Sequence, residues 1–259
     1  MTLVLLVLLW LWLILPRLPR RDMRLFLGLD YAHRGLWDKE VPENSLSAFR
    51  RAARAGYGVE LDIRPSADGE AMVFHDASLR RMCGKEGFVH ELTAAELALL
   101  RLSGTKEAIP TLREALAALG GETPVILEFK AGPGLSELCR RVLPLMRAYP
   151  GPLCVESFDP RALFWFRLHA PDILRGQLVA CPARPFRWRG FFMSSLLHNV
   201  LGRPDFIACD AEGRLNPAFR LLRRLGTPFA VWTVRSPEDR RRHQERFVLQ
   251  IFEGFRPKR

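Results

Sequence analysis

Residues 59–63 read Val59-Glu60-Leu61-Asp62-Ile63, an alternation of apolar and acidic residues around which the other motifs are arranged. In a β-strand, residues two apart point to the same face, so Glu60 and Asp62 project together while their neighbours project into an apolar layer. Two carboxylates on one face repel each other and are costly to bury unless a cation lies between them. The stretch therefore predicts a strand that contributes two ligands to a cation site.

Histidines end the two strand-like segments on either side of it. His33 closes an apolar run that begins at Gly28, and His75 follows the apolar residues 71–74. Imidazole pKa values lie near neutrality, so the two histidines can supply an acid and a base. Arg34 adds a planar fork that suits a phosphate group. Residues 31–76 thus hold much of a metal-assisted acid/base site.

A third carboxylate comes from a later strand-like segment, Val125–Phe129. Glu128 and Lys130 point one way from this segment and Phe129 the other. If Glu128 meets Glu60 and Asp62, the three acids form an oxygen-rich site of the kind that Mg²⁺ or Ca²⁺ prefers. The competing interpretation is a set of ordinary ion pairs between half-exposed residues at strand ends.

Strand-like and helical segments alternate along the rest of the chain. The expected strands are Gly28–His33, the Glu60/Asp62 strand, Ala71–Phe74, Val125–Phe129, Leu153–Ser157, Leu174–Val179, Asp205–Asp210 and Phe229–Val234, with a last apolar run at Phe247–Phe252. The expected helices are one from Asn44 or Ser45 to Ala55, then Thr93–Leu100, Leu112–Leu119, Leu135–Tyr149, Arg161–Leu168, Pro217–Leu225 and Pro237–Arg246. Eight strands alternating with helices favour a (β/α)8 TIM barrel over an open doubly wound sheet. In such a barrel the three acids and both histidines fall at the C-terminal ends of strands, where sites gather.

The length and composition of the chain limit its domain count and its classes of binding partner. The chain has 259 residues, which suits one large domain, and 48% of them are hydrophobic, which is enough for a sizeable core. The formal net charge of +11 favours anionic partners. Five scattered cysteines without Cys-x-x-Cys spacing argue against a disulfide framework or a zinc site, and favour reduced thiols in a cytosolic domain.

The N-terminal segment is almost wholly apolar from Thr2 to Leu15, and Arg17, Arg20 and Arg21 follow it. We expect residues 1–24 to be a hydrophobic membrane anchor with a basic flank, although the run is shorter than the roughly 20 residues of a standard span. The positive-inside rule then places residues 25–259 in the cytoplasm at the cell membrane. An atypical export signal and an interfacial or mis-started segment are the alternatives.

Five motifs together resemble one known family. They are His33-Arg34-Gly35, Pro42-Glu43-Asn44-Ser45, Glu60-Leu61-Asp62, Asp68-Gly69 and His75-Asp76. In this order they resemble the glycerophosphodiester phosphodiesterases, and the chain looks like a membrane-anchored, bacterial-like member. The resemblance spans about residues 30–259, is densest before Asp76, and leaves a small insertion at about 77–110. It implies a metal-dependent TIM-barrel enzyme that hydrolyses glycerophosphodiesters to sn-glycerol 3-phosphate and an alcohol.

The resemblance also implies roles for single residues. Glu60, Asp62 and Glu128 would hold a divalent metal, Mg²⁺ or Ca²⁺, while His33 and His75 would form the acid/base pair. Arg34 and Lys130 would contact phosphate. In the family a neighbouring glycerol hydroxyl is thought to attack phosphorus, giving a cyclic phosphate that water then opens.

Other matching positions carry a second interpretation. Trp232 resembles the family's last-strand tryptophan beside the glycerol, but it is equally an ordinary core aromatic. Glu43, Asn44 and Ser157 would support the site, with helix capping by Asn44 and packing by Ser157 as alternatives. Two departures leave the substrate open: Ser45 stands where threonine is usual, and residues 251–255 replace the commoner terminal Gly-x-x-Thr-Asp.

The leading hypothesis is a membrane-tethered hydrolase of glycerophosphodiesters. A lysophospholipase D acting on lysophospholipids at the bilayer is a close variant, and a non-catalytic phosphate- or lipid-binding barrel is the alternative from another class. Residues 185–201 interleave aromatic residues with arginines, which suits an anionic bilayer surface or, alternatively, a barrel-covering helix with a basic loop. Nucleic-acid binding is not expected, because no aromatic and basic motif falls on a sheet or recognition helix.

Overall fold

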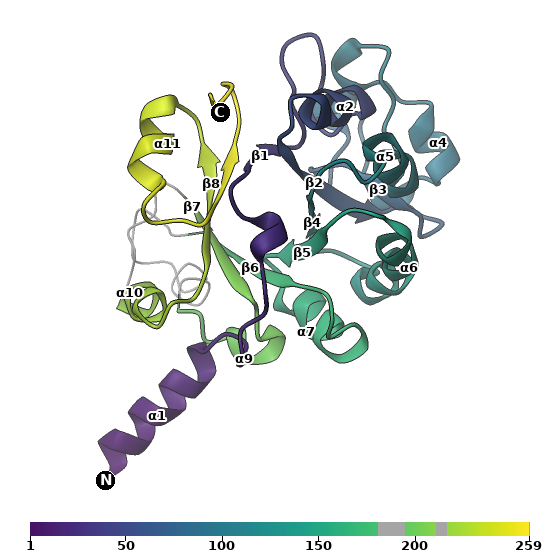
Figure 1. Ribbon diagram of the computed structural model, residues 1–259. Helices are drawn as coiled ribbons and strands as arrows, with labels where there is room; N and C mark the ends of the chain where they lie inside the picture. The colour runs from purple at the N-terminus through teal and green to yellow at the C-terminus, as the bar shows by residue number, and fades with distance from the viewer. Residues whose placement is uncertain (181–194, 211–216, 259) are drawn as a thin grey trace.

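The computed structural model describes residues 1–180, 195–210 and 217–258 (Figure 1). Its strands are β1 (Asp30–His33), β2 (Gly58–Pro65), β3 (Ala71–Val73), β4 (Val125–Phe129), β5 (Leu153–Ser157), β6 (Arg175–Val179), β7 (Phe206–Asp210), β8 (Phe229–Val234) and β9 (Leu249–Phe252). Its α-helices are α1 (Thr2–Ile14), α2 (Leu46–Arg54), α3 (Arg80–Cys83), α4 (Ala94–Ala98), α5 (Leu112–Leu119), α6 (Leu135–Ala148), α7 (Pro160–His169), α9 (Asn199–Gly202), α10 (Pro217–Arg224) and α11 (Pro237–His243). Short 3-10 turns are η1 (Arg24–Phe26), η2 (Val89–Glu91) and η3 (Leu102–Gly104).

The sheet closes into a barrel of parallel strands. Around the ring the order is β1, β2, β4, β5, β6, β7, β8 and β9, and β9 pairs back with β1. Ala32 of β1 lies opposite Val59 on one side and Phe252 on the other. This closure confirms the predicted TIM barrel, because an open doubly wound sheet would leave β1 or a neighbour with a free edge.

Two strand assignments were wrong. The expected third barrel strand, β3, pairs antiparallel with β2 outside the ring, because the short turn Ser66–Glu70 cannot carry the long crossover that parallel strands need. The eighth barrel strand is instead β9, from the last apolar run. Since β2 continues into the hairpin, Glu60 and Asp62 lie within the strand and not at its end. The returning strand brings His75 beside them, with the Phe74 amide donating to the Asp62 carbonyl (3.0 Å).

The barrel interior has an apolar floor below a polar mouth. Ile126 and Cys154 belong to the floor, and Glu128 and Glu156 lie two residues further along the same strands, so they face the same interior one layer higher. Outward-facing strand residues pack against the surrounding helices in the largest apolar cluster. The floor residues are Met23, Phe26, Tyr31, Ile126, Cys154, Leu174, Leu178, Phe206, Ala208, Ala230, Leu249 and Ile251.

Side-chain caps set two helix starts. Ser45 caps α2, since its Oγ accepts from the Ala48 amide (3.2 Å), so Asn44 is left for another role. The helix expected over 93–100 is the shorter α4, because Thr93 is its extended N-cap and Oγ1 accepts from the Glu96 amide (3.3 Å). Around it, residues 77–110 help to build a separate apolar cluster that includes Leu79.

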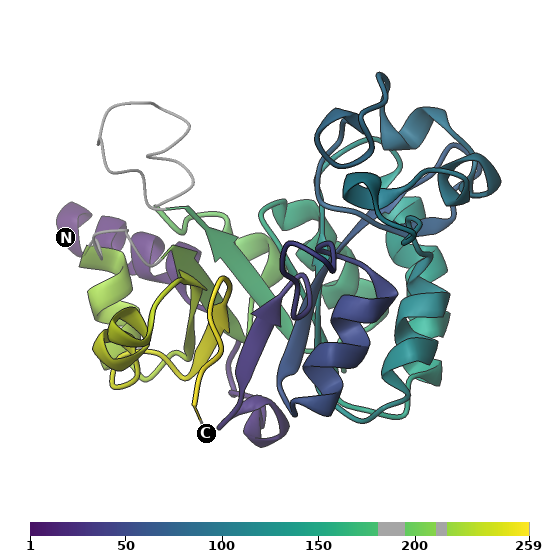
Figure 2. The ribbon, with the colours of Figure 1, turned by 90° about the horizontal axis from the view of Figure 1, so that it is seen from above.

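The N-terminal helix α1 extends sideways from the barrel (Figures 1 and 2). Exposed fractions of its apolar residues 3–9 run from 47% to 74%, whereas Ile14 is fully buried. The helix ends at Ile14, and its C-cap residue Leu15 is extended because Pro16 follows. Within the described residues no helix is long and apolar enough to cross a membrane, so the expected transmembrane helix is not supported.

Two further predictions fall partly beyond the described residues. Residues 185–194 of the interleaved segment lie outside them, as does Cys181. Of the described cysteines, Cys83 is half-buried, and the fully buried ones are Cys139, Cys154 and Cys209.

Candidate active site

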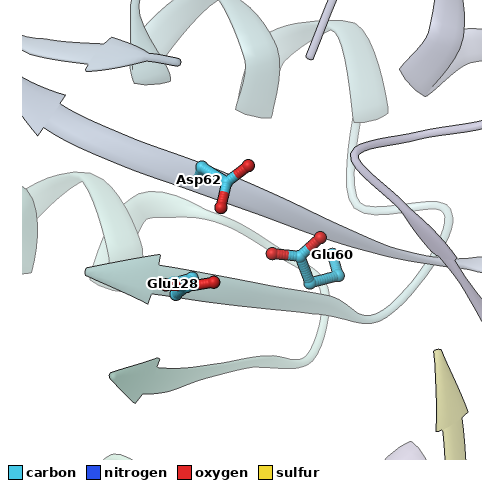
Figure 3. Close-up of side chains that lie close together, drawn as sticks. All are labelled: Glu60, Asp62 and Glu128. Carbon is cyan, nitrogen blue, oxygen red and sulfur yellow. The ribbon is translucent and has the colours of Figure 1, made fainter. Parts of the chain in front are cut away.

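Three buried carboxylates converge at the mouth of the barrel (Figure 3). Glu60 and Asp62 project from the same face of β2, and Glu128 projects from β4, where the register sets it opposite Asp62. One oxygen from each lies within 4.8 Å of the others. Their exposed fractions are 1%, 0% and 6%. The structure thus brings together the three predicted metal ligands.

The cluster carries more negative charge than its surroundings neutralise. Burial, with repulsion from Asp62 and Glu128, raises the pKa of Glu60 well above its ordinary value. Burial likewise raises the pKa of Glu128 to about 7, although the charge of Lys130 opposes the rise. Burial would also raise the pKa of Asp62, but Lys130 and Arg34 outweigh it and lower the pKa. Two of the three acids would therefore ionise more readily beside a further cation.

Two basic side chains contact the cluster directly. Lys130 Nζ lies 2.7 Å from Asp62 Oδ1 and 2.6 Å from Glu128 Oε1. Arg34 Nε lies 3.3 Å from Asp62 Oδ2. Glu60 Oε1 is buried and has no hydrogen-bond partner within the described part of the chain. An all-oxygen donor set with an unpartnered buried oxygen fits a hard divalent cation such as Mg²⁺ or Ca²⁺.

The turn after β1 orients Arg34 toward the cluster. Arg34 has φ 61°, its amide donates to Glu60 Oε2 (3.0 Å), and its Nη1 donates to Glu43 Oε1 (2.9 Å). Gly35 follows with φ 81°, and a Cβ there would lie 2.8 Å from that of Ala48. The His33-Arg34-Gly35 motif therefore needs glycine to bring this turn against α2.

Glu43 and Asn44 hold other site residues in place. Asn44 Nδ2 donates to Asp62 Oδ2 (2.8 Å), so Asn44 supports the acid cluster instead of capping a helix. Glu43 is held between Arg34 and Arg81, whose Nη2 donates to Glu43 Oε1 (2.6 Å).

Each histidine is paired with a carboxylate. His33 Nδ1 lies 2.6 Å from Glu253 Oε2, and His75 Nδ1 lies 2.6 Å from Asp76 Oδ1. Burial would raise the pKa of Glu253, but its hydrogen bond with His33 and the charges nearby lower it to about 2. Burial lowers the pKa of His75, and so favours its neutral imidazole. An ionised partner at Nδ1 fixes the ring orientation and leaves Nε2 as the nitrogen that can meet a substrate.

One cavity of about 330 Å³ unites these groups. Asp62 and Asn44 are buried and do not line it, but Asp62 contacts the lining residue Lys130. Ser157 also lies outside it: the hydroxyl is fully buried, donates to the Phe129 carbonyl (2.6 Å) and accepts from the Asp159 amide (3.0 Å), which fits a packing role. The cavity is lined by His33, Arg34, Trp37, Glu43, Glu60, His75, Glu128, Lys130, Glu156, Phe158, Leu178, Trp232, Thr233, Arg235, Ile251 and Glu253.

Two acidic lining residues, Glu253 and Glu156, were missed in the sequence. Glu253 directly follows β9, and an acid just after a barrel strand was an available signal. Glu156 shares the inward face of β5 with Cys154, and its pKa is raised well above the ordinary value by burial. Phe158 packs edge to face on Trp232, with ring centroids 5.6 Å apart. Trp232 belongs to β8, so it lies on the seventh barrel strand and not, as expected, on the last.

Comparison with known proteins agrees with this geometry. Residues 33–252 match the model of the glycerophosphoryl diester phosphodiesterase family. A glycerophosphodiester phosphodiesterase of Caldanaerobacter subterraneus is 30% identical over 245 residues, which cover 87% of this chain and 92% of that protein.

Solved structures show the same fold. An Oleispira antarctica phosphodiesterase in complex with the product sn-glycerol-3-phosphate superposes with a TM-score of 0.74, at 24% identity over 88% of this chain and 93% of that one. A glycerophosphodiester phosphodiesterase of Thermotoga maritima gives a TM-score of 0.68, at 25% identity over 87% and 94%. The chain therefore belongs to the glycerophosphoryl diester phosphodiesterase family and is a phosphodiester hydrolase.

Proposed function

We propose that this enzyme hydrolyses glycerophosphodiesters to sn-glycerol 3-phosphate and an alcohol. The observation that supports the proposal is that one cavity is lined by Glu60 and Glu128 of the buried acid cluster, by two carboxylate-paired histidines and by the basic side chains of Arg34 and Lys130. A phosphodiester needs its charge neutralised, its nucleophile deprotonated and its leaving oxygen protonated. This inventory meets all three needs, whereas a barrel that only bound phosphate would not need an acid/base pair.

Glu60, Asp62 and Glu128 would hold the divalent cation. When bound, the cation would neutralise charge on the phosphate oxygens. Lys130 and Arg34 would bind the same group, the first as a point charge and the second as a planar fork. Since Mg²⁺ and Ca²⁺ both prefer oxygen ligands, the donor set favours this pair over softer metals.

His33 and His75 would move the protons. The neutral imidazole of His75 suits the base that takes a proton from the neighbouring glycerol hydroxyl, whose oxygen attacks phosphorus. His33, held by Glu253, would give a proton to the alcohol oxygen as its bond to phosphorus breaks. With the roles reversed, the pair would then guide water to open the cyclic phosphate and yield the phosphomonoester.

The aromatic pair on one side of the cavity would bind the glycerol. Trp232 is partly buried, and Phe158 supports its ring edge to face. An apolar wall opposite the charged cluster would orient the glycerol carbons with the phosphate toward Arg34 and Lys130.

We also propose that α1 attaches the protein to the cytoplasmic face of the cell membrane. Its exposed apolar residues suit acyl chains, and Arg17, Arg20 and Arg21 follow on one side only. Fractionation with protease protection tests this. Digestion of residues 25–259 from outside intact cells would contradict the placement. The same location favours a second candidate, lysophospholipase D activity, in which the glycerol still carries an acyl chain.

Turnover assays separate the two activities. The purified protein would be supplied with glycerophosphocholine or a lysophospholipid, each with Mg²⁺, with Ca²⁺ or with a chelator. We expect metal-dependent turnover of glycerophosphocholine, and His33→Ala and His75→Ala should each lower it by roughly a hundredfold or more while the fold persists. A near-normal rate in either folded variant would refute the acid/base roles.

A further inference from the structure

A second cavity, of about 450 Å³, lies where α1 joins the barrel. Arg175 begins β6 and Arg203 shortly precedes β7, so this cavity lies by the N-terminal ends of those strands. It shares no lining residue with the catalytic cavity, which lies by the C-terminal ends. Trp12 and Leu15 of the N-terminal segment form part of its wall. It is therefore a separate site whose chemistry is not that of the reaction.

Four arginines line this cavity, and each donates to backbone carbonyl groups. The hydrogen bonds are Arg17 to Pro171 (2.8 Å), Arg167 to Val200 (2.7 Å), Arg175 to Gly202 (3.1 Å) and Arg203 to Leu15 (2.8 Å). Within residues 1–180, 195–210 and 217–258, none of the four guanidinium groups forms an ion pair with a carboxylate. The nearby acid Asp205 accepts from the backbone amide of Arg175 (2.9 Å). The cavity thus carries a marked excess of positive charge.

The burial of Arg175 makes this excess of positive charge energetically unfavourable. Its exposed fraction is 1%, and a buried guanidinium without an anionic partner is unfavourable. Burial lowers its pKa to about 10, and the charges of Arg17 and Arg167 act in the same direction, while Asp205 opposes the shift. An anion in the cavity would relieve this repulsion. A phosphate group suits several guanidinium forks at once.

The apolar helix beside the cavity identifies the source of that phosphate. Trp12 is 55% exposed, and its ring centroid lies 5.0 Å from the Arg203 guanidinium carbon. The 13 residues of α1 span about 20 Å, which is less than the roughly 30 Å hydrocarbon core of a bilayer. Placed among acyl chains, α1 would reach partway through the membrane from one side. The arginine cavity at its base would then lie at the depth of the lipid headgroups.

We propose that this cavity binds the phosphate of an anionic phospholipid whose acyl chains pack on α1. The inference rests on the proposed membrane attachment and adds a headgroup preference to it. A zwitterionic lipid carries its own cation beside the phosphate, so it offers less relief to four unpaired arginines. Membrane binding should therefore depend on anionic lipid through these side chains, whereas hydrolysis should not.

The test is vesicle flotation of the full chain. Vesicles of phosphatidylcholine alone would be compared with vesicles that contain an increasing share of phosphatidylglycerol. The cavity variant is Arg17→Gln/Arg167→Gln, which keeps the buried Arg175. The matched control is Arg50→Gln/Arg113→Gln, which removes the same charge from exposed positions on α2 and α5, away from α1 (Figure 1). All three proteins should hydrolyse glycerophosphocholine at the same rate, which verifies their folding.

We expect the wild type and the control to bind phosphatidylglycerol vesicles at least tenfold more tightly than phosphatidylcholine vesicles. Two arginines that face an anionic membrane surface contribute roughly this much affinity. The cavity variant should lose most of that preference but still bind neutral vesicles. An equal loss in both variants would show a mere net-charge effect, and no anionic preference in the wild type would also overturn the proposal. If the wild type bound no vesicle at all, the membrane attachment itself would fail.

A second measurement distinguishes lipid from free phosphate. Thermal unfolding would be followed with inorganic phosphate or with a soluble short-chain phosphatidylglycerol. Because the catalytic cavity can also bind phosphate, the quantity compared is the rise in Tm of the wild type minus that of the cavity variant. We expect a difference for the lipid only. An equal difference for inorganic phosphate would assign the cavity to a free anion and overturn the lipid assignment.

Discussion

Removal of divalent cations should make the enzyme lose stability as the pH rises toward neutrality. The cause is the buried acid cluster of Glu60, Asp62 and Glu128, whose close basic neighbours include Lys130 and Arg34. In the folded, metal-free protein Glu128 keeps its proton to a pKa of about 7, compared with an ordinary 4.5. The folded state therefore binds more protons than the unfolded state between these values, and stability falls with rising pH.

The size of the effect follows from that pKa. A rise from 4.5 to about 7 corresponds to roughly 3 kcal/mol of lost stability once the pH exceeds the folded pKa. None of this loss is present below pH 4.5. A divalent cation between the carboxylates favours their ionised forms, so saturating metal should remove most of the loss. For a chain of this length the difference amounts to several degrees in Tm.

The assay is thermal unfolding with Mg²⁺, Ca²⁺ or a chelator, at about pH 5 and about pH 8. We expect metal to raise Tm much more at the higher pH. In the chelator, Glu128→Gln should remove the Glu128 share of the pH dependence, while Glu60, whose pKa burial also raises, keeps its own share. Asp68→Asn provides a matched control, because Asp68 is a carboxylate outside the cluster. Equal stabilisation by metal at both pH values, or none at either, would refute the reasoning.

Three substitutions test other contacts. Glu253→Gln removes the charged partner of His33, so kcat for glycerophosphocholine should fall roughly 10–100-fold with little change in KM; an unchanged kcat would remove Glu253 from the mechanism. Lys130→Met leaves the cluster without its bridging ammonium, so urea unfolding of the metal-free protein at neutral pH should show roughly 3 kcal/mol less stability, and added Mg²⁺ or Ca²⁺ should restore part of it. No loss of stability in this variant would mean that the carboxylates of the cluster carry no net charge without Lys130. Ser45→Ala removes the cap of α2 and should cost about 1 kcal/mol in urea unfolding with kcat preserved; a loss of activity without a loss of stability would contradict a purely capping role.

The sequence was most informative where strand periodicity and chemistry coincide. Glu60 and Asp62 on one face of a strand, with Glu128 on another, predicted a shared cation site because buried carboxylates demand one. The structure places the three where that argument requires. The barrel was predictable from the alternation of eight strand-like segments with helices. The three acids alone do not require closure, because β2 and β4 are neighbours in the sheet.

The errors also have physical causes. Apolar runs of three or four residues do not show whether a strand is parallel or antiparallel, so β3 was counted in the ring in place of β9. The carboxylate partners of the two histidines differ in how far they could be predicted. Asp76 is adjacent to His75 in the sequence, whereas Glu253 reaches His33 only through the pairing of β9 with β1. The arginine cavity beside α1 could not be predicted either, because Arg17, Arg167, Arg175 and Arg203 meet only in the folded chain.

The most direct test of the central claim is phosphorus NMR of glycerophosphocholine incubated with the purified full chain. With Mg²⁺ or Ca²⁺ the substrate signal should be replaced by that of sn-glycerol 3-phosphate, with free choline as the second product. A chelator or His75→Ala should stop the conversion. Release of phosphocholine, or no conversion with any divalent metal, would contradict the assignment of this cavity as a glycerophosphodiester hydrolase site.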